Sequence, residues 1–187
     1  MNTKVGFIGL GAMGLPLAKN LQRKGFDVNG FDIDHNRADA IVELGGRKAA
    51  TVAEAARGAD IVITCLPATP HVEAVVLGAD GVLANIDKGA LLLEMSTIDA
   101  NGTDRVAKAC KERGTPFVDS PIGRLVLHAE RGESLFMVGS TDENFARVDL
   151  AGYLRQVATQ LFRGQNSDLG AVRLTLDLAP ASVGIDQ

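Results

Sequence analysis

The stretch that most constrains the fold is "FIGLGAMGLPLAKNL", Phe7 to Leu21, in which Gly9, Gly11 and Gly14 have the spacing G-x-G-x-x-G. The apolar run "KVGFIGL" precedes the motif, and an amphipathic helical pattern follows it to about Lys24. A strand that turns sharply into a helix at such glycines is typical of the first unit of a dinucleotide-binding fold. Any tight strand-to-helix turn also favours glycine, so the spacing alone leaves a purely structural turn open.

The second predicted strand strengthens the dinucleotide interpretation. It ends in "GFDID", where Asp32 lies 21 residues after Gly11, and an acidic residue at this distance meets the adenosine ribose hydroxyls. The free N–H groups and the dipole of the following helix favour a phosphate charge. Asp32 would repel a 2′-phosphate, so NAD is expected in preference to NADP, although Arg37 nearby would weaken that preference.

Strand-like runs alternate with helical patterns along the chain. The strands are expected at "KVGFIGL", "FDVNGFDID", "DIVITCLP", "GALLLEMS", "PFVDSP" and "SLFMVGS". Helices are expected over about 35–44, from Thr51, over 69–77 with Thr69 as N-cap, and over 99–113. The alternation predicts an α/β fold of the Rossmann type, a doubly wound and mostly parallel sheet that is covered on both faces.

The last helix is expected to end the domain. Ser140 to Glu143 is typical of a capping box, and apolar residues then recur at helical spacing. They are Phe145, Val148, Leu154, Val157, Ala158 and Leu161. We therefore expect an NAD(P)-binding domain over residues 1–162, followed by a short remainder over 163–187.

Composition excludes several functional classes. With 46% hydrophobic and 22% charged residues, the chain is expected to be soluble and globular, and its net charge of −4 argues against nucleic acid as a partner. It contains no apolar run of membrane-spanning length and no signal-peptide pattern at its start, so a cytoplasmic location and no membrane contact are expected. Cys65 and Cys110 lack metal-ligand spacing, so reduced thiols and no metal site are expected.

Further motifs carry a resemblance to a known family. The glycine loop continues with Met13, Pro16 and Asn20, and the motifs "CLP", "EMSTI", "DSPIGR" and "LFMVGS" follow in order. Over about Lys4 to Leu161 the chain resembles the β-hydroxyacid dehydrogenases, the group of 3-hydroxyisobutyrate dehydrogenase. The resemblance implies an NAD(P)-binding N-terminal domain, hydride transfer to or from small 3-hydroxy acids or semialdehydes, and a helical C-terminal domain, which this chain lacks or holds only in part.

The resemblance also implies which residues hold the cofactor. They are Gly9, Gly11, Ala12, Met13, Gly14, Asp32, Leu66, Pro67 and Ser96. Ser96 in "EMSTI" would in addition approach the substrate carboxylate, because the carboxyl ends of strands form the ligand crevice in such sheets. The alternative is that Ser96 or Thr97 is the N-cap of the following helix.

The loop "DSPIGR" is the substrate signal. Gly123 and Arg124 resemble the pattern of sulfolactaldehyde reductases, in which the arginine meets the sulfonate, so a small carboxylate or sulfonate is expected as substrate. Leu125 departs from that pattern, and a solvated surface arginine is the alternative. His128 is a further acid/base candidate, but a loop histidine without a catalytic role is favoured.

The catalytic residue of the family has no counterpart in this chain. "LGAVRLTLDLA", Leu169 to Ala179, is the best match to the interdomain helix and puts Thr175 at the position of the family's lysine, while no lysine follows Lys111. Arg173 does not exchange protons near neutral pH. We therefore expect a weak or inactive dehydrogenase that forms homo-oligomers, with a non-catalytic dinucleotide-binding module or a truncated inactive fragment as the alternatives.

Overall fold

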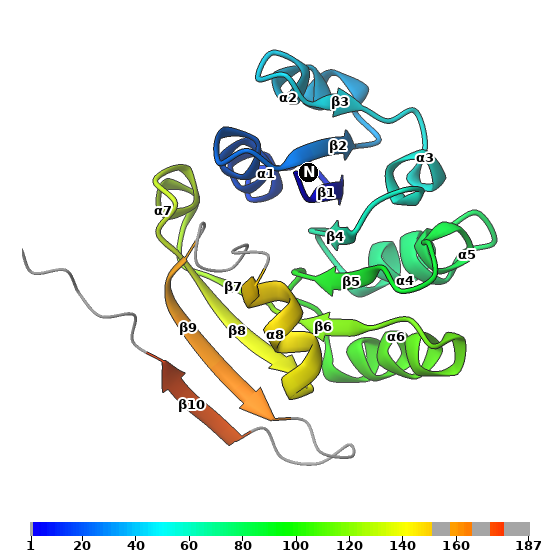
Figure 1. Cartoon of the computed structure of the whole chain (residues 1–187), viewed down its shortest axis with the longest axis vertical. Coiled ribbons are helices and arrows are strands. Elements are labelled where there is room, and N and C mark those ends of the chain that lie inside the picture. Colours follow the sequence, from blue (N-terminus) through cyan, green and yellow to red (C-terminus); the bar gives the residue numbers. More distant parts are fainter. Residues whose placement is uncertain (1, 151–157, 166–172, 178–187) are drawn as a thin grey trace, which may run out of the picture.

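The computed structural model of the chain describes residues 2–150, 158–165 and 173–177. Its strands are β1 (Lys4–Ile8), β2 (Asp27–Phe31), β3 (Arg47–Lys48), β4 (Ile61–Thr64), β5 (Leu91–Glu94), β6 (Phe117–Asp119), β7 (Ile122–Gly123), β8 (Ser134–Ser140), β9 (Ala158–Gln165) and β10 (Arg173–Asp177). They form one sheet in the order β10-β9-β8-β6-β5-β4-β1-β2-β3, with β7 paired to β8 (Figure 1).

Six strands form the parallel part of the sheet, in the order β3-β2-β1-β4-β5-β6. Val5 of β1 is paired with Val28 on one side and with Ile61 of β4 on the other. The direction of winding reverses between β1 and β4, and in such sheets a ligand binds outside the carboxyl ends of the strands at this point. The predicted doubly wound α/β fold is confirmed.

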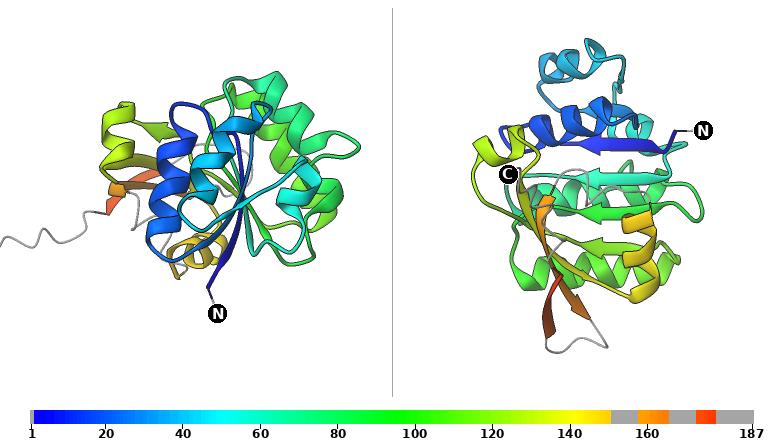
Figure 2. Two further views of the ribbon diagram at one scale, coloured as in Figure 1. Left: turned by 90° about the horizontal axis from the view of Figure 1, so that it is seen from above. Right: turned by 60° about the vertical axis from the view of Figure 1, so that its left-hand side comes forward.

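Helices cover both faces of the sheet. They are α1 (Gly14–Arg23), η1 (His35–Ala38), α2 (Asp39–Val42), α3 (Val52–Ala56), α4 (Thr69–Leu77), α5 (Val82–Asn85), α6 (Ala100–Arg113), α7 (Val126–Glu130) and α8 (Asp142–Leu150). One apolar core lies under α1, α2, α7 and α8, and a second lies under α3 to α6 (Figures 1 and 2). None of these helices is long and apolar enough to cross a membrane.

The helix starts agree with the predicted caps in part. The Glu54 N–H donates to Thr51 Oγ1 at 3.1 Å, as the predicted capping box requires. At α8 the cap is Thr141, which accepts from the Asn144 N–H, and Ser140 is not the cap. At α4 the N-cap is Ala68, because the predicted cap Thr69 begins the helix and its hydroxyl donates to Asp99 instead.

Two predicted helical segments are strands instead. α8 is followed by β9, which runs parallel to β8, so the helical pattern that was extended to Leu161 is wrong over residues 158–161. β8 would otherwise expose unpaired backbone groups along one edge, and β9 satisfies them. β10, at the expected interdomain helix, alternates Leu174 and Leu176 with polar residues, the period of two that is typical of strands.

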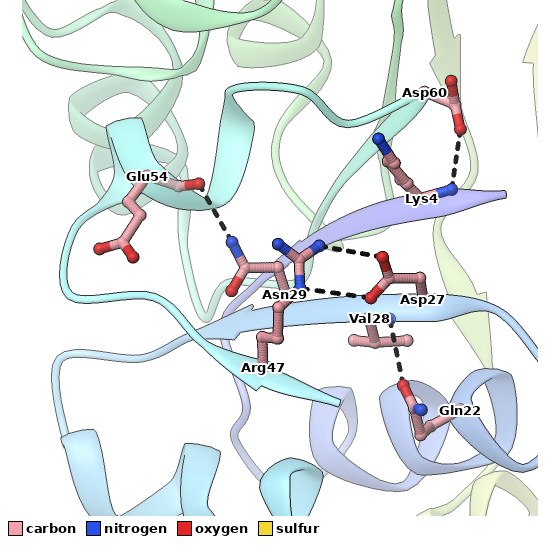
Figure 3. Close-up of polar contacts among 8 residues, drawn as sticks. All are labelled: Lys4, Gln22, Asp27, Val28, Asn29, Arg47, Glu54 and Asp60. Atoms are coloured by element: carbon pink, nitrogen blue, oxygen red, sulfur yellow. Dashed lines mark hydrogen bonds and ion pairs between the residues drawn. The ribbon is translucent and has the colours of Figure 1, made fainter. Parts of the chain in front are cut away.

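Polar contacts hold the far edge of the sheet at β3 (Figure 3). Arg47 of β3 forms an ion pair with Asp27 of β2 at 3.1 Å. The buried Asn29 amide of β2 donates to the backbone carbonyl of Glu54 at 3.1 Å. These contacts tie the short edge strand β3 and helix α3 to the neighbouring strand β2.

Two carboxylates lie at paired positions on the adjacent strands β5 and β6. Glu94 is fully buried and Asp119 is half-buried, and their backbones are in register. Burial raises the pKa of both groups. Burial, and then the charge of Glu94, raise the pKa of Asp119 to about 7 from 3.8.

We predict that stability falls as the pH rises through this window. Between about pH 4 and 7 the folded chain keeps a proton on Asp119 that the unfolded chain has already released. Raising the pH through this range therefore favours unfolding. Asp119→Asn removes this contribution and should flatten the melting temperature between pH 5 and 7.5. Calorimetric melts of both proteins across that range are the measurement. An identical pH dependence in the variant would contradict the raised pKa of Asp119.

Candidate cofactor-binding site

A pocket of about 670 Å³ lies at the carboxyl ends of β1, β4 and β5, at the point where the strand order reverses. The structure brings most of the predicted site residues together around it. Its lining includes Gly9, Gly11, Ala12, Met13, Gly14, Asp32, Leu66, Pro67, Ser96 and Arg124. These residues come from segments up to 115 positions apart, and the parallel sheet aligns the strand ends from which they project.

The three motif glycines lack a side chain for different physical reasons. Gly9 has φ of +96°, and a Cβ there would collide with the carbonyl of Cys65. A Cβ on Gly14 would collide with the carbonyl of Gly9, so α1 can lie this close to β1 only without a side chain. A Cβ on Gly11 would meet only the Arg37 guanidinium, at an ordinary 3.6 Å. The packing of the chain itself therefore requires Gly9 and Gly14, whereas the missing side chain of Gly11 leaves space in the pocket.

The N-terminus of α1 opens into this pocket. Its N-cap, Met13, provides no side-chain acceptor, and the first turn contains no acidic residue. The ten-residue helix directs the positive end of its dipole and N–H groups toward the space beside Gly11. This arrangement fits the pyrophosphate of a dinucleotide, which binds at such a helix terminus.

Asp32 fastens the glycine loop as well as facing the pocket. Its Oδ2 accepts from the Leu10 N–H at 2.7 Å, and its Oδ1 accepts from the Asp34 N–H at 2.9 Å. The Arg37 guanidinium lies 3.7 Å from Oδ2, and Asp32 is only 7% exposed. A carboxylate accepts about four hydrogen bonds, so Asp32 keeps capacity for ribose hydroxyls beyond these two.

The pocket lining also includes residues that the sequence did not point to. One face of α4 contributes His71, Ala74 and Val75, at the i, i+3, i+4 spacing of a helix face. Ile33, directly after Asp32, is 88% exposed and also lines the pocket. The helical spacing after "CLP" was the signal for α4, and an apolar wall of this kind suits the flat face of an adenine or nicotinamide ring.

Ser96 joins the ends of β4 and β5 at the pocket. Its Oγ accepts from the Leu66 N–H at 2.8 Å, and its own N–H donates to Glu94 Oε1 at 2.6 Å. The predicted alternative, a capping role for Ser96 or Thr97, is wrong, because Asp99 caps α6 by accepting from the Gly102 N–H at 2.9 Å. The Ser96 hydroxyl therefore bonds to another pocket-lining residue, Leu66, rather than to the start of α6.

Arg124 lines the pocket in an unusual backbone conformation. Its φ is +74°, in the left-handed region that favours glycine, and its guanidinium donates to the Glu133 carbonyl at 3.0 Å. Gly123, predicted beside it as a substrate residue, instead faces Leu135, which a Cβ would approach to 2.9 Å, and is not among the pocket-lining residues described. His128 is part of α7 rather than a loop, and its buried Nδ1 has no hydrogen-bond partner in the described part of the chain.

Neither Cys65 nor Thr175 is placed for a catalytic role in the part of the chain that the structure describes. Cys65 lines the pocket as a free thiol, and burial together with the charge of Glu94 raises its pKa to about 12, so it stays protonated and unreactive. The residues that the structure describes contain no group of ligands for a metal ion. Thr175 lies on β10, where its partner in the ladder is Arg163 of β9.

Comparison with known proteins identifies the family of the chain. A family model described as the NAD binding domain of 6-phosphogluconate dehydrogenase matches residues 4–164. The chain is 41% identical over 140 residues to an NAD-dependent L-serine dehydrogenase of Pseudomonas aeruginosa, covering 75% of this chain and 47% of that protein. It is 40% identical over 144 residues to mitochondrial 3-hydroxyisobutyrate dehydrogenase of Mus musculus, covering 77% and 43%.

A solved structure gives the same result. The 3-hydroxyisobutyrate dehydrogenase of Mycobacterium tuberculosis with L-serine superposes with a TM-score of 0.82 at 29% identity, over 89% of this chain and 56% of that one. The chain thus spans about half the length of the relatives that it matches. By sequence and by fold, the chain belongs to the 3-hydroxyisobutyrate dehydrogenase family and corresponds to its NAD-binding N-terminal domain.

Proposed function

We propose that this chain binds NAD(H) in the pocket at the β1–β4 reversal, with NADP(H) as the weaker ligand. The observation that carries the proposal is Gly11, whose missing side chain no neighbour in the fold requires. In this arrangement the first turn of α1 binds the pyrophosphate, and Asp32 accepts from the ribose hydroxyls. Leu66, Pro67 and the α4 face flank the rings.

The proposed reaction is hydride transfer between the nicotinamide and a small 3-hydroxy acid or semialdehyde. The nicotinamide supplies or accepts the hydride. Ser96 and Arg124 line the same pocket, where the hydroxyl would orient a substrate carboxylate and the guanidinium would pair with an anionic group, a carboxylate or a sulfonate such as that of sulfolactaldehyde. Exclusion of water by the apolar wall would strengthen both contacts.

The proton donor for the resulting alkoxide is not assigned. A positioned general acid contributes about 10²–10⁴-fold to such a step, and a threonine hydroxyl at position 175 stays un-ionised without an activating base. We therefore predict that this chain catalyses the hydride transfer only slowly. The division into a cofactor domain over residues 1–162 and a remainder, the homo-oligomer and the cytoplasmic location also stay predictions.

The first test of the proposal is Gly11→Val. The added side chain would occupy the space for the pyrophosphate, while the fold itself meets it only with the mobile end of Arg37, so NADH affinity should fall by at least about tenfold, or about 1.4 kcal/mol. Fluorescence titration of NADH measures this. Ala84→Val, on an exposed position of α5, is the control and should bind normally. Equal binding by the parent and Gly11→Val would overturn the assignment.

The second test concerns the choice between NAD(H) and NADP(H). Asp32→Asn removes a charge that repels the 2′-phosphate, and Arg37→Gln removes the cation that would attract it. The ratio of NADH to NADPH affinity should therefore fall in the first variant and rise in the second, each by about tenfold. Arg57→Gln, which removes a cation outside this pocket, should leave the ratio unchanged. A parent chain that prefers NADPH would show that the interpretation of Asp32 is wrong.

The third test asks whether Arg124 binds the substrate anion, as distinct from stabilising the fold. A left-handed conformation costs a residue other than glycine or asparagine about 1 kcal/mol, so Arg124→Asn should fold at least as stably as the parent. The same variant should weaken binding of 3-hydroxyisobutyrate or sulfolactate to the NADH-saturated chain by about tenfold. Thermal melts and calorimetric titration are the two measurements. Arg131→Asn, an exposed residue at the end of α7, is the control, and equal anion binding by all three proteins would contradict the role.

A further inference from the structure

Glu94 is hydrogen-bonded to the ends of β4 and β5, the two strands that lead into the pocket. This carboxylate is fully buried at the end of β5, below the pocket-lining Ser96. Its Oε1 accepts from the Ser96 N–H at 2.6 Å, and its Oε2 accepts from the hydroxyl of Thr64, at the end of β4, at 2.5 Å.

The contacts of Glu94 continue through Ser96 to Leu66. The Ser96 Oγ accepts from the Leu66 N–H at 2.8 Å, so the contacts run from the carboxylate through the Ser96 N–H and the Ser96 side chain to the backbone of the neighbouring loop. Leu66 and Pro67 form one wall of the pocket, and Ser96 forms the adjacent part. β4 and β5 are neighbours in the sheet, so one side chain can hold the ends of both strands (Figure 1).

A fully buried carboxylate is a costly means of joining two strands. Glu94 has no ion-pair partner in the described part of the chain, and burial raises its pKa. Removing a carboxylate from water without a counter-charge is unfavourable unless hydrogen bonds satisfy its oxygens. Its partners in the described part of the chain are a hydroxyl and a backbone N–H at two neighbouring strand ends, so we expect the length of the side chain to decide whether it meets both.

We propose that Glu94 is a positioning residue: by accepting from the Ser96 N–H it holds the Ser96 side chain, and through it the Leu66 N–H, in the geometry that receives the nicotinamide end of the cofactor. The part of this statement that concerns the cofactor rests on the proposed function. The effect on the Leu66 N–H is a property of the chain alone and needs no bound cofactor. We expect the length of the Glu94 side chain to matter more than its charge, because the contacts on both oxygens are hydrogen bonds rather than ion pairs.

The experiment compares two conservative variants. Glu94→Gln keeps the length and loses the charge: its amide oxygen can accept from the Ser96 N–H while its amide nitrogen donates to Thr64. Glu94→Asp keeps the charge and is shorter by one methylene. NADH affinity should stay within about threefold of the parent in Glu94→Gln and fall by about tenfold in Glu94→Asp. Glu112→Asp, the same shortening at an exposed position of α6, is the control and should bind NADH normally.

A double-mutant cycle tests whether the effect passes through Ser96. If it does, Glu94→Asp combined with Ser96→Ala should bind NADH within about threefold of Ser96→Ala alone, because the second change acts on a contact already lost. Multiplied effects would show that Glu94 acts independently of Ser96 and would overturn the proposal. Normal binding by Glu94→Asp, or equal loss in the Gln and Asp variants, would also overturn it.

A second readout needs no cofactor. The Leu66 amide should exchange its hydrogen about tenfold faster in Glu94→Asp than in the parent and at the parent rate in Glu94→Gln, as measured by NMR on the free chain. Failure of the parent to bind NADH would reject the proposed function while this exchange still tests the positioning role. Unchanged exchange in Glu94→Asp would reject the positioning role even if NADH binds.

Discussion

The close approach of α1 to the end of β1 is the contact on which the rest of the site depends. The carbonyl of Gly9 occupies the space in which a side chain on Gly14 would stand, so the helix can begin directly above the strand only with glycine at that position. This approach brings the uncapped N-terminus of α1 to the point where the winding of the sheet reverses. The reversal separates the helices that follow β1 and β4, and the pocket occupies the resulting crevice.

Two buried carboxylates then shape the walls of that pocket. Asp32, at the end of β2, accepts from the Leu10 N–H of the glycine loop, and Glu94, at the end of β5, accepts from Ser96. Both accept from backbone N–H groups just past the end of a strand, where no neighbouring strand offers a carbonyl as acceptor. A carboxylate can accept several donors at once, whereas a hydroxyl accepts fewer, and this makes an acidic side chain suited to joining two irregular segments. Asp32 therefore contributes to the loop as well as to any ribose contact.

Much of the fold could be predicted from the sequence, and the misses have physical causes. β1, β2, β4, β5, β6 and β8 and the longer helices α1, α4 and α6 were predicted because their apolar periodicity is strong. Residues 158–161 of β9 were predicted as the end of a helix, because Leu161 and its apolar neighbours fit a spacing of three to four as well as a spacing of two. Pairing with the open edge of β8 decides between these, and no local pattern reports it. β10 lies where the family resemblance implied the interdomain helix.

The sequence by itself determined the parallel α/β architecture, the glycine turn and the residue types around the pocket, because strand periodicity and the steric demands of glycine act over a few neighbouring residues. Only the tertiary structure decided how those residues divide their hydrogen bonds. Asp99 takes the cap of α6 and leaves the Ser96 hydroxyl to Leu66, Gly123 faces Leu135, and Glu94 reaches two strand ends. Each of these outcomes joins residues from different segments, and the distance between such donors and acceptors is set by packing rather than by their spacing in the chain.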